Sequence, residues 1–278
     1  MSEAGTLYVC ATPIGNLGDI TLRVLETLRR VDLIAAEDTR HSRRLLQHYE
    51  IKTPLTSYHE HNEKGKTKLL LQRLKEGASI ALISDAGMPG ISDPGAEIIR
   101  ACQEAGIKVD ILPGPNAVLP ALLLSGLPTV SFLFHGFLPA AAGERRRVLT
   151  GLAKLPFTLI FYEAPHRLTE MLKDVGDIFG TRPAAVVREI TKLHQSVHRG
   201  LLPDLWQEFA QQPARGECVV VVAPYLGKKA AGSAEDWVRE VDRRLSLGLA
   251  PQEAMKEVAK EFGITKREVY QAVLKLKK

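Results

Sequence analysis

The sequence has few of the residues and runs that mark several protein classes. Its 278 residues include only three cysteines, Cys10, Cys102 and Cys218, which are scattered, form no C-x-x-C pair and have no adjacent histidine. This spacing argues against a disulfide framework and against a zinc site. We therefore expect three buried, unpaired thiols and no bound metal.

Long apolar runs and export signals are missing as well. The longest apolar stretch, 117–127, is interrupted by Pro120, Ser125 and Gly126, and a bilayer-spanning helix needs about 20 apolar residues. The first five residues contain neither the basic segment nor the apolar segment that open a secretory signal. We expect a cytoplasmic protein that does not enter a membrane.

Two common phosphate-binding signatures are also absent. The sequence contains no G-x-G-x-x-G fingerprint and no G-x-x-x-x-G-K-[ST] loop, so neither a dinucleotide nor a nucleoside triphosphate is an expected ligand. It has instead two loops rich in glycine and proline, at 9–21 and 84–95, each of which follows a short apolar run. We interpret these loops as backbone cradles that face one small ligand without phosphates.

The second of these loops carries the strongest local pattern. Gly87 and Gly90 permit a positive φ, and Pro89 stiffens the path between them. Asp93 followed by Pro94 predicts the start of a helix, with Asp93 as its cap and Pro94 as its first residue. A strand-to-helix connection accounts for this last part alone, whereas the segment 85–90 indicates a ligand site.

Short apolar runs alternate with helical patterns along the first 117 residues. Strands are predicted at 7–11, 33–36, 80–83 and 109–112, with helices at 20–30, 66–76 and 97–105. This alternation predicts a parallel sheet with crossover helices, in which the loops after the strands meet at one edge. A second α/β domain is predicted over 118–226, with strands at 131–134, 158–162, 184–187, 197–200 and 218–223 and helices at 144–154, 166–178 and 202–212.

A basic, small-residue linker at 226–233 precedes a third unit, 233–278, that is predicted to be helical. Its end shows a helix from Pro251, a turn at Gly263 and a second helix capped by Thr265, an arrangement similar to a helix-turn-helix. Residues 228–278 hold twelve Lys and Arg against eight Asp and Glu, which is most of the net charge of +5. A basic appendage favours a polyanionic partner, although a packing hairpin with a solvated surface explains it equally well.

Seven motifs occur in one order along the chain, at 11–17, 36–40, 84–95, 113–117, 136–139, 162–167 and 188–192. With them the chain resembles the tetrapyrrole methylase superfamily, the class III S-adenosylmethionine methyltransferases. Within it, the motifs at 36–40 and 162–167 are similar to those of the branch that methylates the 2'-oxygen of ribose in bacterial 16S rRNA. The sequence departs from that branch at Asn116, where Ser is usual, and at Gln195 and Ser196, where acidic residues are common.

The resemblance implies two α/β domains of the tetrapyrrole methylase type with the cofactor between them, and a homodimer. It implies S-adenosylmethionine as the cofactor and a decoding-region cytidine ribose of 16S rRNA, in the small ribosomal subunit, as the acceptor. Asp85 is then the best single ligand for a ribose hydroxyl or the amino group. The full set of expected cofactor contacts is Thr12, Pro13, Ile14, Gly15, Asn16, Asp85, Ala86, Gly87, Met88, Pro89, Gly90, Ser92, Pro113, Gly114, Pro115, Asn116 and Ala117.

A ribose hydroxyl ionises far above neutral pH, so a carboxylate or a neutral amine near it should help to remove its proton. The candidates are Asp38, Glu163, Glu189 and Lys192. Each carboxylate also has a structural interpretation: Asp38 caps a helix, Glu163 caps a helix that opens at Pro165, and Glu189 pairs with Arg188 or Lys192. The expected RNA contacts are Arg40, Arg145, Arg146, Arg147, Arg167, Arg188, Lys266 and Arg267.

Two other functions fit parts of the pattern. An enzyme of the same fold that methylates carbon in a corrinoid or siroheme precursor would need a cleft for a macrocycle and no basic tail. A regulator that reads DNA with its terminal hairpin would bind duplex DNA specifically and turn nothing over.

Overall fold

The computed structural model describes residues 4–227, 233–246 and 248–276. The chain divides into two compact units, one of Met1–Thr150 with Thr158–Ala223 and one of Gly151–Phe157 with Pro224–Lys278. The first unit holds two five-stranded sheets. The second holds three C-terminal helices.

The first sheet is parallel throughout, with strand order β3-β2-β4-β1-β5. Its strands are β1 Thr6–Cys10, β2 Leu33–Ala36, β3 Leu55–Ser57, β4 Ile80–Ile83 and β5 Lys108–Leu112. The predicted parallel sheet is confirmed, and its four predicted strands begin within one residue of the observed ones. The three residues of β3 are too few to show a period in the sequence, so this strand was not predicted.

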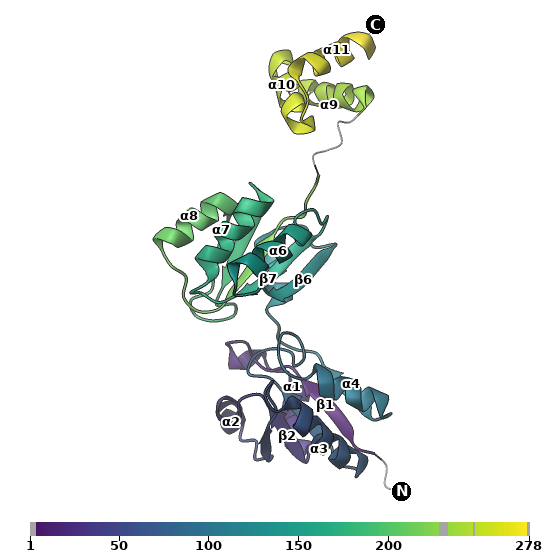
Figure 1. Ribbon diagram of the computed structural model, residues 1–278, viewed down its shortest axis with the longest axis vertical. Helices are drawn as coiled ribbons and strands as arrows, with labels where there is room; N and C mark the ends of the chain where they lie inside the picture. The colour runs from purple at the N-terminus through teal and green to yellow at the C-terminus, as the bar shows by residue number, and fades with distance from the viewer. Residues whose placement is uncertain (1–3, 228–232, 247, 277–278) are drawn as a thin grey trace. The chain divides into compact units, whose positions relative to one another are not determined.

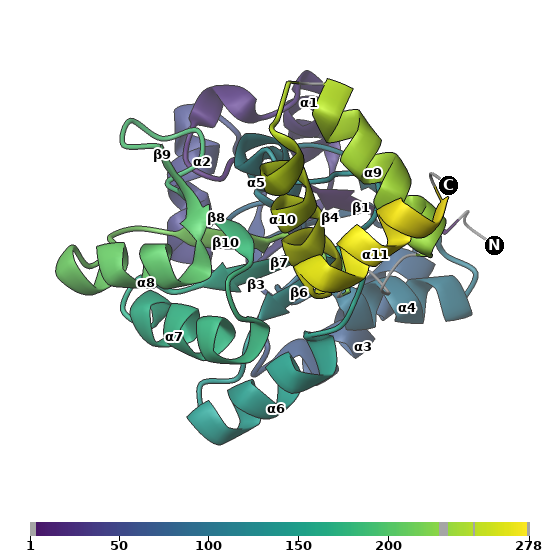
Figure 2. The same cartoon turned by 90° about the horizontal axis from the view of Figure 1, so that it is seen from above.

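Helices cover both faces of this sheet. On one face α1 (Leu22–Arg30) and α2 (Thr39–His48) pack with Ala81 and Ile83 of β4. On the other face α3 (Glu63–Lys75) and α4 (Ala96–Glu104), which lie side by side in Figures 1 and 2, pack with Ile80 and Leu82. All four β4 residues are buried, as expected for a parallel sheet covered on both sides. The long loops follow the carboxyl ends of the strands, at the edge of the sheet that the helices do not cover.

The predicted start of α4 is wrong. The helix begins at Ala96 rather than Pro94, and its cap position is Gly95, at φ 140°, with no side-chain cap bond. A Cβ on Gly95 would lie 2.9 Å from Leu82 Cδ2 and 3.1 Å from the Gly90 nitrogen. The loop therefore folds back on itself before the helix can start, which leaves the Asp93 side chain available for another role.

The second sheet is mixed, with order β6-β7-β10-β8-β9. β6 and β7 pair in parallel and the other neighbours pair antiparallel. The strands are β6 Phe132–Phe137, β7 Thr158–Glu163, β8 Pro183–Arg188, β9 Ser196–Leu201 and β10 Cys218–Val222. All five predicted strands are confirmed, with ends that differ by up to three residues.

Four helices accompany the second sheet: α5 Val118–Ser125, α6 Ala142–Leu152, α7 Leu168–Phe179 and α8 Leu202–Gln211. Apolar residues of α5 share a core with β7, β8 and β10. α7 and α8 lie side by side in both ribbon views (Figures 1 and 2), and α8 packs on β8 and β9. Ile14, from the loop after β1, packs against the α5 core, so residues of the first loop help to cover the second sheet.

The C-terminal helices are α9 Ala234–Ser246, α10 Pro251–Phe262 and α11 Lys266–Leu276, and they share one core. Gly263, at φ 65°, ends α10. Thr265 and Glu268 exchange side-chain to backbone bonds at the start of α11, which is a capping box. The predicted helix, glycine turn and threonine-capped helix are thus confirmed. Part of the predicted linker, 228–232, lies outside the described residues.

Among the residues that the structure describes, no helix is both long enough and apolar enough to cross a bilayer. Cys10, Cys102 and Cys218 are buried and unpaired, as predicted.

Candidate functional site

The two loops singled out in the sequence lie against each other. Thr12 and Gly87 exchange two backbone hydrogen bonds, from the Thr12 amide to the Gly87 carbonyl (2.9 Å) and from the Gly87 amide to the Thr12 carbonyl (3.0 Å). The Thr12 hydroxyl also donates to the Ser84 carbonyl at 3.0 Å. The loops after β1 and β4 therefore form one bridged rim at the carboxyl edge of the parallel sheet.

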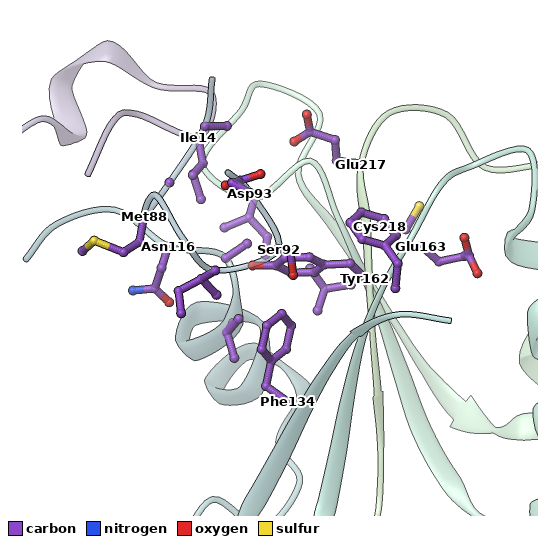
Figure 3. Close-up of a pocket in the computed structure, with 18 of the residues that line it drawn as sticks. Ile14, Met88, Ser92, Asp93, Asn116, Phe134, Tyr162, Glu163, Glu217 and Cys218 are labelled. Atoms are coloured by element: carbon purple, nitrogen blue, oxygen red, sulfur yellow. The ribbon is translucent and has the colours of Figure 1, made fainter. Parts of the chain in front are cut away.

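A cavity of about 680 Å³ adjoins this rim, and residues of both sheets line it. The parallel sheet contributes residues of the loops after β1, β4 and β5, and the mixed sheet contributes side chains of β6, β7 and β10. Figure 3 shows Ser92, Asp93 and Tyr162 near the centre of this space, with Phe134 below them. The lining residues are Ile14, Ala86, Gly87, Met88, Ile91, Ser92, Asp93, Pro113, Gly114, Asn116, Ala117, Val118, Phe134, Phe137, Tyr162, Glu163, Ala164, Pro165, Ile190, Glu217, Cys218 and Val219.

A smaller cavity, of about 230 Å³, is lined by other residues of the same two loops and by the start of α2. It is more polar than the larger one. Its lining residues are Thr12, Pro13, Gly15, Leu17, His41, Ser42, Arg44, Leu45, Ser84 and Asp85. The bridge residue Thr12 lines this cavity and its partner Gly87 lines the larger one.

The residues predicted to bind the cofactor are thereby divided into three groups. Ile14, Ala86, Gly87, Met88, Ser92, Pro113, Gly114, Asn116 and Ala117 line the larger cavity. Thr12, Pro13, Gly15 and Asp85 line the smaller one. Asn16, Pro89, Gly90 and Pro115 line neither. Asn16 instead caps a short 3-10 turn by accepting a bond from the Gly18 amide.

Asp85 connects the ends of two strands. Its Oδ1 accepts a bond from the Asp38 amide at 3.1 Å, and its own amide donates to Glu37 Oε2 at 3.3 Å. These bonds join the loop after β4 to the loop after β2. Asp85 thus holds the loops after β2 and β4 together, and it also lines the smaller cavity.

Glu163, at the end of β7, is buried in the wall of the larger cavity. Its Oε1 accepts a bond from the Ala164 amide at 2.9 Å and lies 3.3 Å from Arg167 Nε. Burial raises the pKa of this carboxyl, and Arg167 opposes that rise. The predicted capping role is wrong, because α7 begins at Leu168 and its cap position is Arg167.

Asp93 lines the larger cavity, although the sequence pattern predicted only that it caps a helix. Burial, and after it the nearby charges of Glu37 and Asp85, raise the pKa of Asp93 to about 7. A hydrogen bond with Ser84 acts in the opposite direction. The sequence did hold one sign of this role, because the loop at 84–95 carries two carboxylates. Asp85 braces the rim through its hydrogen bonds, and Asp93 lines the larger cavity.

Asp38 has the structural role that the sequence left open. It is the cap of α2, with Oδ1 accepting from the Arg40 amide at 2.8 Å. The Arg40 side chain pairs with it at 3.2 Å and, as the main cause, lowers the pKa of Asp38. Neither residue lines either cavity.

Glu189 and Lys192 also form the predicted alternative pair. Lys192 Nζ lies 2.9 Å from Glu189 Oε1 and 3.2 Å from Glu217 Oε2. Desolvation alone would lower the pKa of Lys192, but its bonds to these two carboxylates raise it. The amine therefore stays protonated at neutral pH, where it cannot accept a proton.

The loop that carries Lys192 reaches the rim of the parallel sheet. A Cβ on Gly15, at φ 149°, would lie 2.4 Å from Lys192 Cγ, so the lysine stem lies directly over this glycine. The Thr191 hydroxyl donates to Asp19 Oδ2 at 2.6 Å. These contacts hold the loop after β8 against the loop after β1.

The expected RNA contacts differ in what they already bind. The Arg145 side chain is only 3% exposed and pairs with Asp174 at 2.7 Å, so it joins α6 to α7 and is not available to RNA. Arg167 is held by Glu163 and the Leu138 carbonyl, and Arg188 donates to the Arg215 carbonyl at 2.8 Å. The remaining candidates are more exposed: Arg40, Arg146, Arg147, Lys266 and Arg267.

Comparison of the sequence with known protein families identifies the family to which these loops belong. The sequence model of the tetrapyrrole (corrin/porphyrin) methylases matches residues 6–205. The chain is 46% identical over 274 residues to ribosomal RNA small subunit methyltransferase I of Synechocystis, covering 98% of each chain. It is 48% identical over 278 residues to the protein of that name from Pseudomonas aeruginosa, again covering 98% of each. With the Bacillus subtilis protein of that name it shares 43% identity over 276 residues, which is 98% of this chain and 94% of the relative.

Solved structures resemble the chain in fold. The methyltransferase CobJ aligns with a TM-score of 0.60 at 20% identity, over 80% of this chain and 95% of its own. Cobalt precorrin-4 methyltransferase aligns with a TM-score of 0.57 at 20% identity, over 78% of this chain and 94% of its own. At this identity the likeness establishes the fold alone, and the fold class expected from the sequence is confirmed.

Proposed function

The chain belongs to the tetrapyrrole (corrin/porphyrin) methylase family, and we propose that it transfers a methyl group from S-adenosylmethionine to the RNA of the small ribosomal subunit. One observation carries this proposal. Relatives named for that RNA are 43–48% identical to the chain and match it from end to end, the C-terminal helical unit included. The structures of corrin-type enzymes share only about a fifth of its residues.

The larger cavity fits the proposed cofactor. A volume of about 680 Å³ lies within the range of small-molecule sites, roughly 300–1,000 Å³. Its walls combine loop backbone at Gly87 and Gly114 with the rings of Phe134 and Tyr162. Aromatic faces attract cations, including the sulfonium of this cofactor. We propose that these loops hold the nucleoside and that the rings face the charged sulfur.

When bound, the cofactor supplies a methyl group already activated on a positively charged sulfur. The chain must then align the acceptor oxygen behind that methyl group and keep water out. Good alignment is worth roughly 7–11 kcal/mol, far more than one proton acceptor contributes. The bridged loops suit this task, because the bonds between Thr12 and Gly87 and between Asp85 and Asp38 fix their backbones before any ligand arrives.

The exact acceptor is a further part of the proposal. The motifs at 36–40 and 162–167, which resemble the ribose-methylating branch, support the 2'-oxygen of a decoding-region cytidine in 16S rRNA. The exposed arginines of α6 and the basic C-terminal helices supply cations for the phosphates. We also propose a homodimer and a cytoplasmic location, in keeping with a ribosomal substrate in bacteria.

The test uses purified protein, labelled S-adenosylmethionine and small subunits, or their naked RNA, from a strain that lacks the modification. We expect label in the RNA, on the ribose of one cytidine after digestion. Label on a uroporphyrinogen-type acceptor and none on either RNA substrate would overturn the proposal. Light scattering of the same preparation tests the homodimer.

A matched deletion tests the role of the C-terminal unit. Removing 233–278 should weaken RNA association and flatten its dependence on salt, because fewer phosphate contacts then release counterions. Affinity for the cofactor should stay unchanged, since every residue lining the larger cavity belongs to the other compact unit. If the full chain and the shortened protein bind RNA equally across a salt series, the C-terminal unit has no role in RNA binding.

A further inference from the structure

The smaller cavity is lined by a buried hydroxyl that the protein itself does not use. Ser42, near the start of α2, lines this cavity and is 2% exposed. Its Oγ has no hydrogen-bond partner in the part of the chain that the structure describes. A buried hydroxyl without a partner is costly, and most such groups in folded proteins are satisfied. The hydroxyl of Ser42 is therefore available to a ligand in this cavity.

An unpaired cation lines the same cavity. The Arg44 side chain is exposed, and among the described residues its guanidinium forms no ion pair and no hydrogen bond. His41 lines the cavity as well, and a histidine ring donates from both nitrogens when it is protonated. A guanidinium, an imidazole and a hydroxyl around one space are typical of a site that binds a phosphate group.

One carboxylate, that of Asp85, also lines the cavity and opposes an anion there. Its Oδ1 accepts a bond from the Asp38 amide at 3.1 Å, and the Asp85 amide donates to Glu37 Oε2 at 3.3 Å. Because Asp85 and Glu37 are both acidic, an anion in this cavity depends on Arg44 to balance its charge. Loss of Arg44 should therefore matter more than loss of an ordinary exposed arginine.

We propose that the smaller cavity binds a phosphate group of the RNA strand, next to the acceptor ribose. This inference rests on the proposed function and gives it an RNA site that includes Ser42 and Arg44. The two cavities adjoin across the backbone bridge, since Thr12 lines the smaller one and Gly87 the larger. Each ribose of a strand has a phosphate on both sides. A strand that brings its 2'-oxygen to the larger cavity thus carries a phosphate to the smaller one, and this contact positions the ribose.

The size of the smaller cavity agrees with a fragment of a strand. Its volume of about 230 Å³ is several times the roughly 30 Å³ that one water molecule takes up in the liquid. It is also below the roughly 300–1,000 Å³ that is usual for sites that enclose a whole small molecule. A phosphate group with part of its sugar is a ligand of the intermediate size.

The cofactor offers Arg44 a competing partner, which the test must separate. S-adenosylmethionine ends in a carboxylate, which is also an anion with one charge. The larger cavity, of about 680 Å³, lies within the usual range for a whole small molecule, so the cofactor needs no second cavity. The two roles also differ in a measurable way. A carboxylate of the cofactor is bound without RNA, and a phosphate of the RNA is bound without cofactor.

The experiment compares wild type with R44A and R44K and uses R43A as the matched control. Arg43 is the exposed neighbour of Arg44 on α2 and lines neither cavity. Binding of naked 16S rRNA is measured without cofactor across a salt series. R44A should weaken binding about tenfold at low salt and reduce the slope of log affinity against log salt by about 0.7–0.9. R44K keeps the charge and should keep the slope, and R43A should match wild type.

S42A tests the hydroxyl separately. It changes no charge, so the salt slope should stay as in wild type while binding weakens about two- to tenfold. Because the Ser42 hydroxyl has no partner within the described residues, S42A should unfold at the same temperature as wild type or at a higher one. Single-turnover methyl transfer to unmodified small subunits should fall in step with RNA binding in R44A and S42A. By calorimetry, all four variants should bind S-adenosylmethionine within about twofold of wild type.

Each result decides between the alternatives. Equal salt slopes for R44A and R43A would overturn the inference. So would an S42A protein that is less stable than wild type and binds RNA normally, since the hydroxyl would then serve the fold. A large loss of affinity for S-adenosylmethionine in R44A would assign the arginine to the cofactor carboxylate instead. If wild type neither binds nor labels the RNA of the small subunit, the proposed function fails and not merely the phosphate site.

Discussion

The larger cavity is lined by a carboxylate from each sheet region, Glu163 and Asp93, and the groups next to these two carboxylates differ in charge. Glu163, at the end of β7, has a fully buried side chain that is held by Arg167 and a backbone amide. Asp93, in the loop after β4, has the acidic neighbours Glu37 and Asp85, and among the described residues no arginine forms an ion pair with it. The mixed sheet therefore pairs its buried carboxylate with a cation, while the rim of the parallel sheet leaves Asp93 next to other acidic groups.

The largest effect should come from breaking the neutralised side. In Arg167→Ala, Glu163 is left buried without its cation, which should lower the free energy of unfolding by about 3–5 kcal/mol. The loss should be smaller at low pH, because burial already raises the pKa of Glu163 and the unpaired carboxyl escapes by taking up a proton. Urea unfolding at pH 5 and pH 8 measures both effects.

Arg147→Ala is the control for this prediction. Arg147 is 80% exposed, and its contact with Glu144 is long, at 3.9 Å. Its removal should therefore change the free energy of unfolding by less than about 0.5 kcal/mol. If Arg167→Ala lowers the free energy of unfolding no more than Arg147→Ala does, Arg167 does not stabilise the buried Glu163 carboxylate, and the contrast with Asp93 fails.

The second prediction concerns the backbone that presents Asp93. Gly95→Ala adds a Cβ 2.9 Å from Leu82 Cδ2 at a left-handed φ, so it should destabilise the fold by about 2–4 kcal/mol through strain and overpacking. It should also weaken cofactor binding, because the loop that carries Ser92 must shift. Thermal unfolding and calorimetry provide the two measurements.

Gly65→Ala is the matched substitution. Gly65 lies within α3, and nothing stands within 4 Å of its Cβ position. Alanine there should stabilise the fold by about 0.5–1 kcal/mol. Similar behaviour of the two variants would show that the rim tolerates a side chain and that Gly95 is not part of its construction.

The third prediction uses pH to sharpen the contrast between the two carboxylates. The pKa of Asp93 is about 7 in the folded protein and about 3.9 in an unfolded chain. Between these values the folded state holds a proton that the unfolded state releases, so this residue lowers stability as pH rises from 4 to 7. Asp93→Asn removes that loss, and above pH 7 it should be more stable than wild type by about 1–2 kcal/mol after allowance for solvent screening.

At pH 4 the two proteins should be equally stable. Denaturant unfolding across this range measures the difference. A difference between the proteins that stays constant with pH would mean that Asp93 titrates normally, and the contrast between the two carboxylates would be lost.

The sequence predicted most of the fold because its patterns are local. The runs at 33–36 and 80–83 became β2 and β4 without change, and Thr265 caps its helix as expected. The division of the cofactor loops between two cavities could not be predicted, because it depends on the backbone bridge between Thr12 and Gly87, which are far apart in sequence. Asp93 was assigned to a helix cap because nothing local reveals that Gly95 must avoid Leu82.

The smallest predicted effect concerns the contact between the two regions. The Thr191 hydroxyl donates to Asp19 at 2.6 Å and so ties the loop after β8 to the loop after β1. Thr191→Val keeps the side-chain shape and removes this exposed bond, which should cost about 0.5–1.5 kcal/mol and raise the dissociation constant for the cofactor a few-fold. Thr150→Val removes a bond within α6 alone and should leave that constant unchanged. Equal constants for all three proteins would mean that the parallel-sheet rim holds its conformation without help from the mixed sheet, since its own backbone bridge would then suffice.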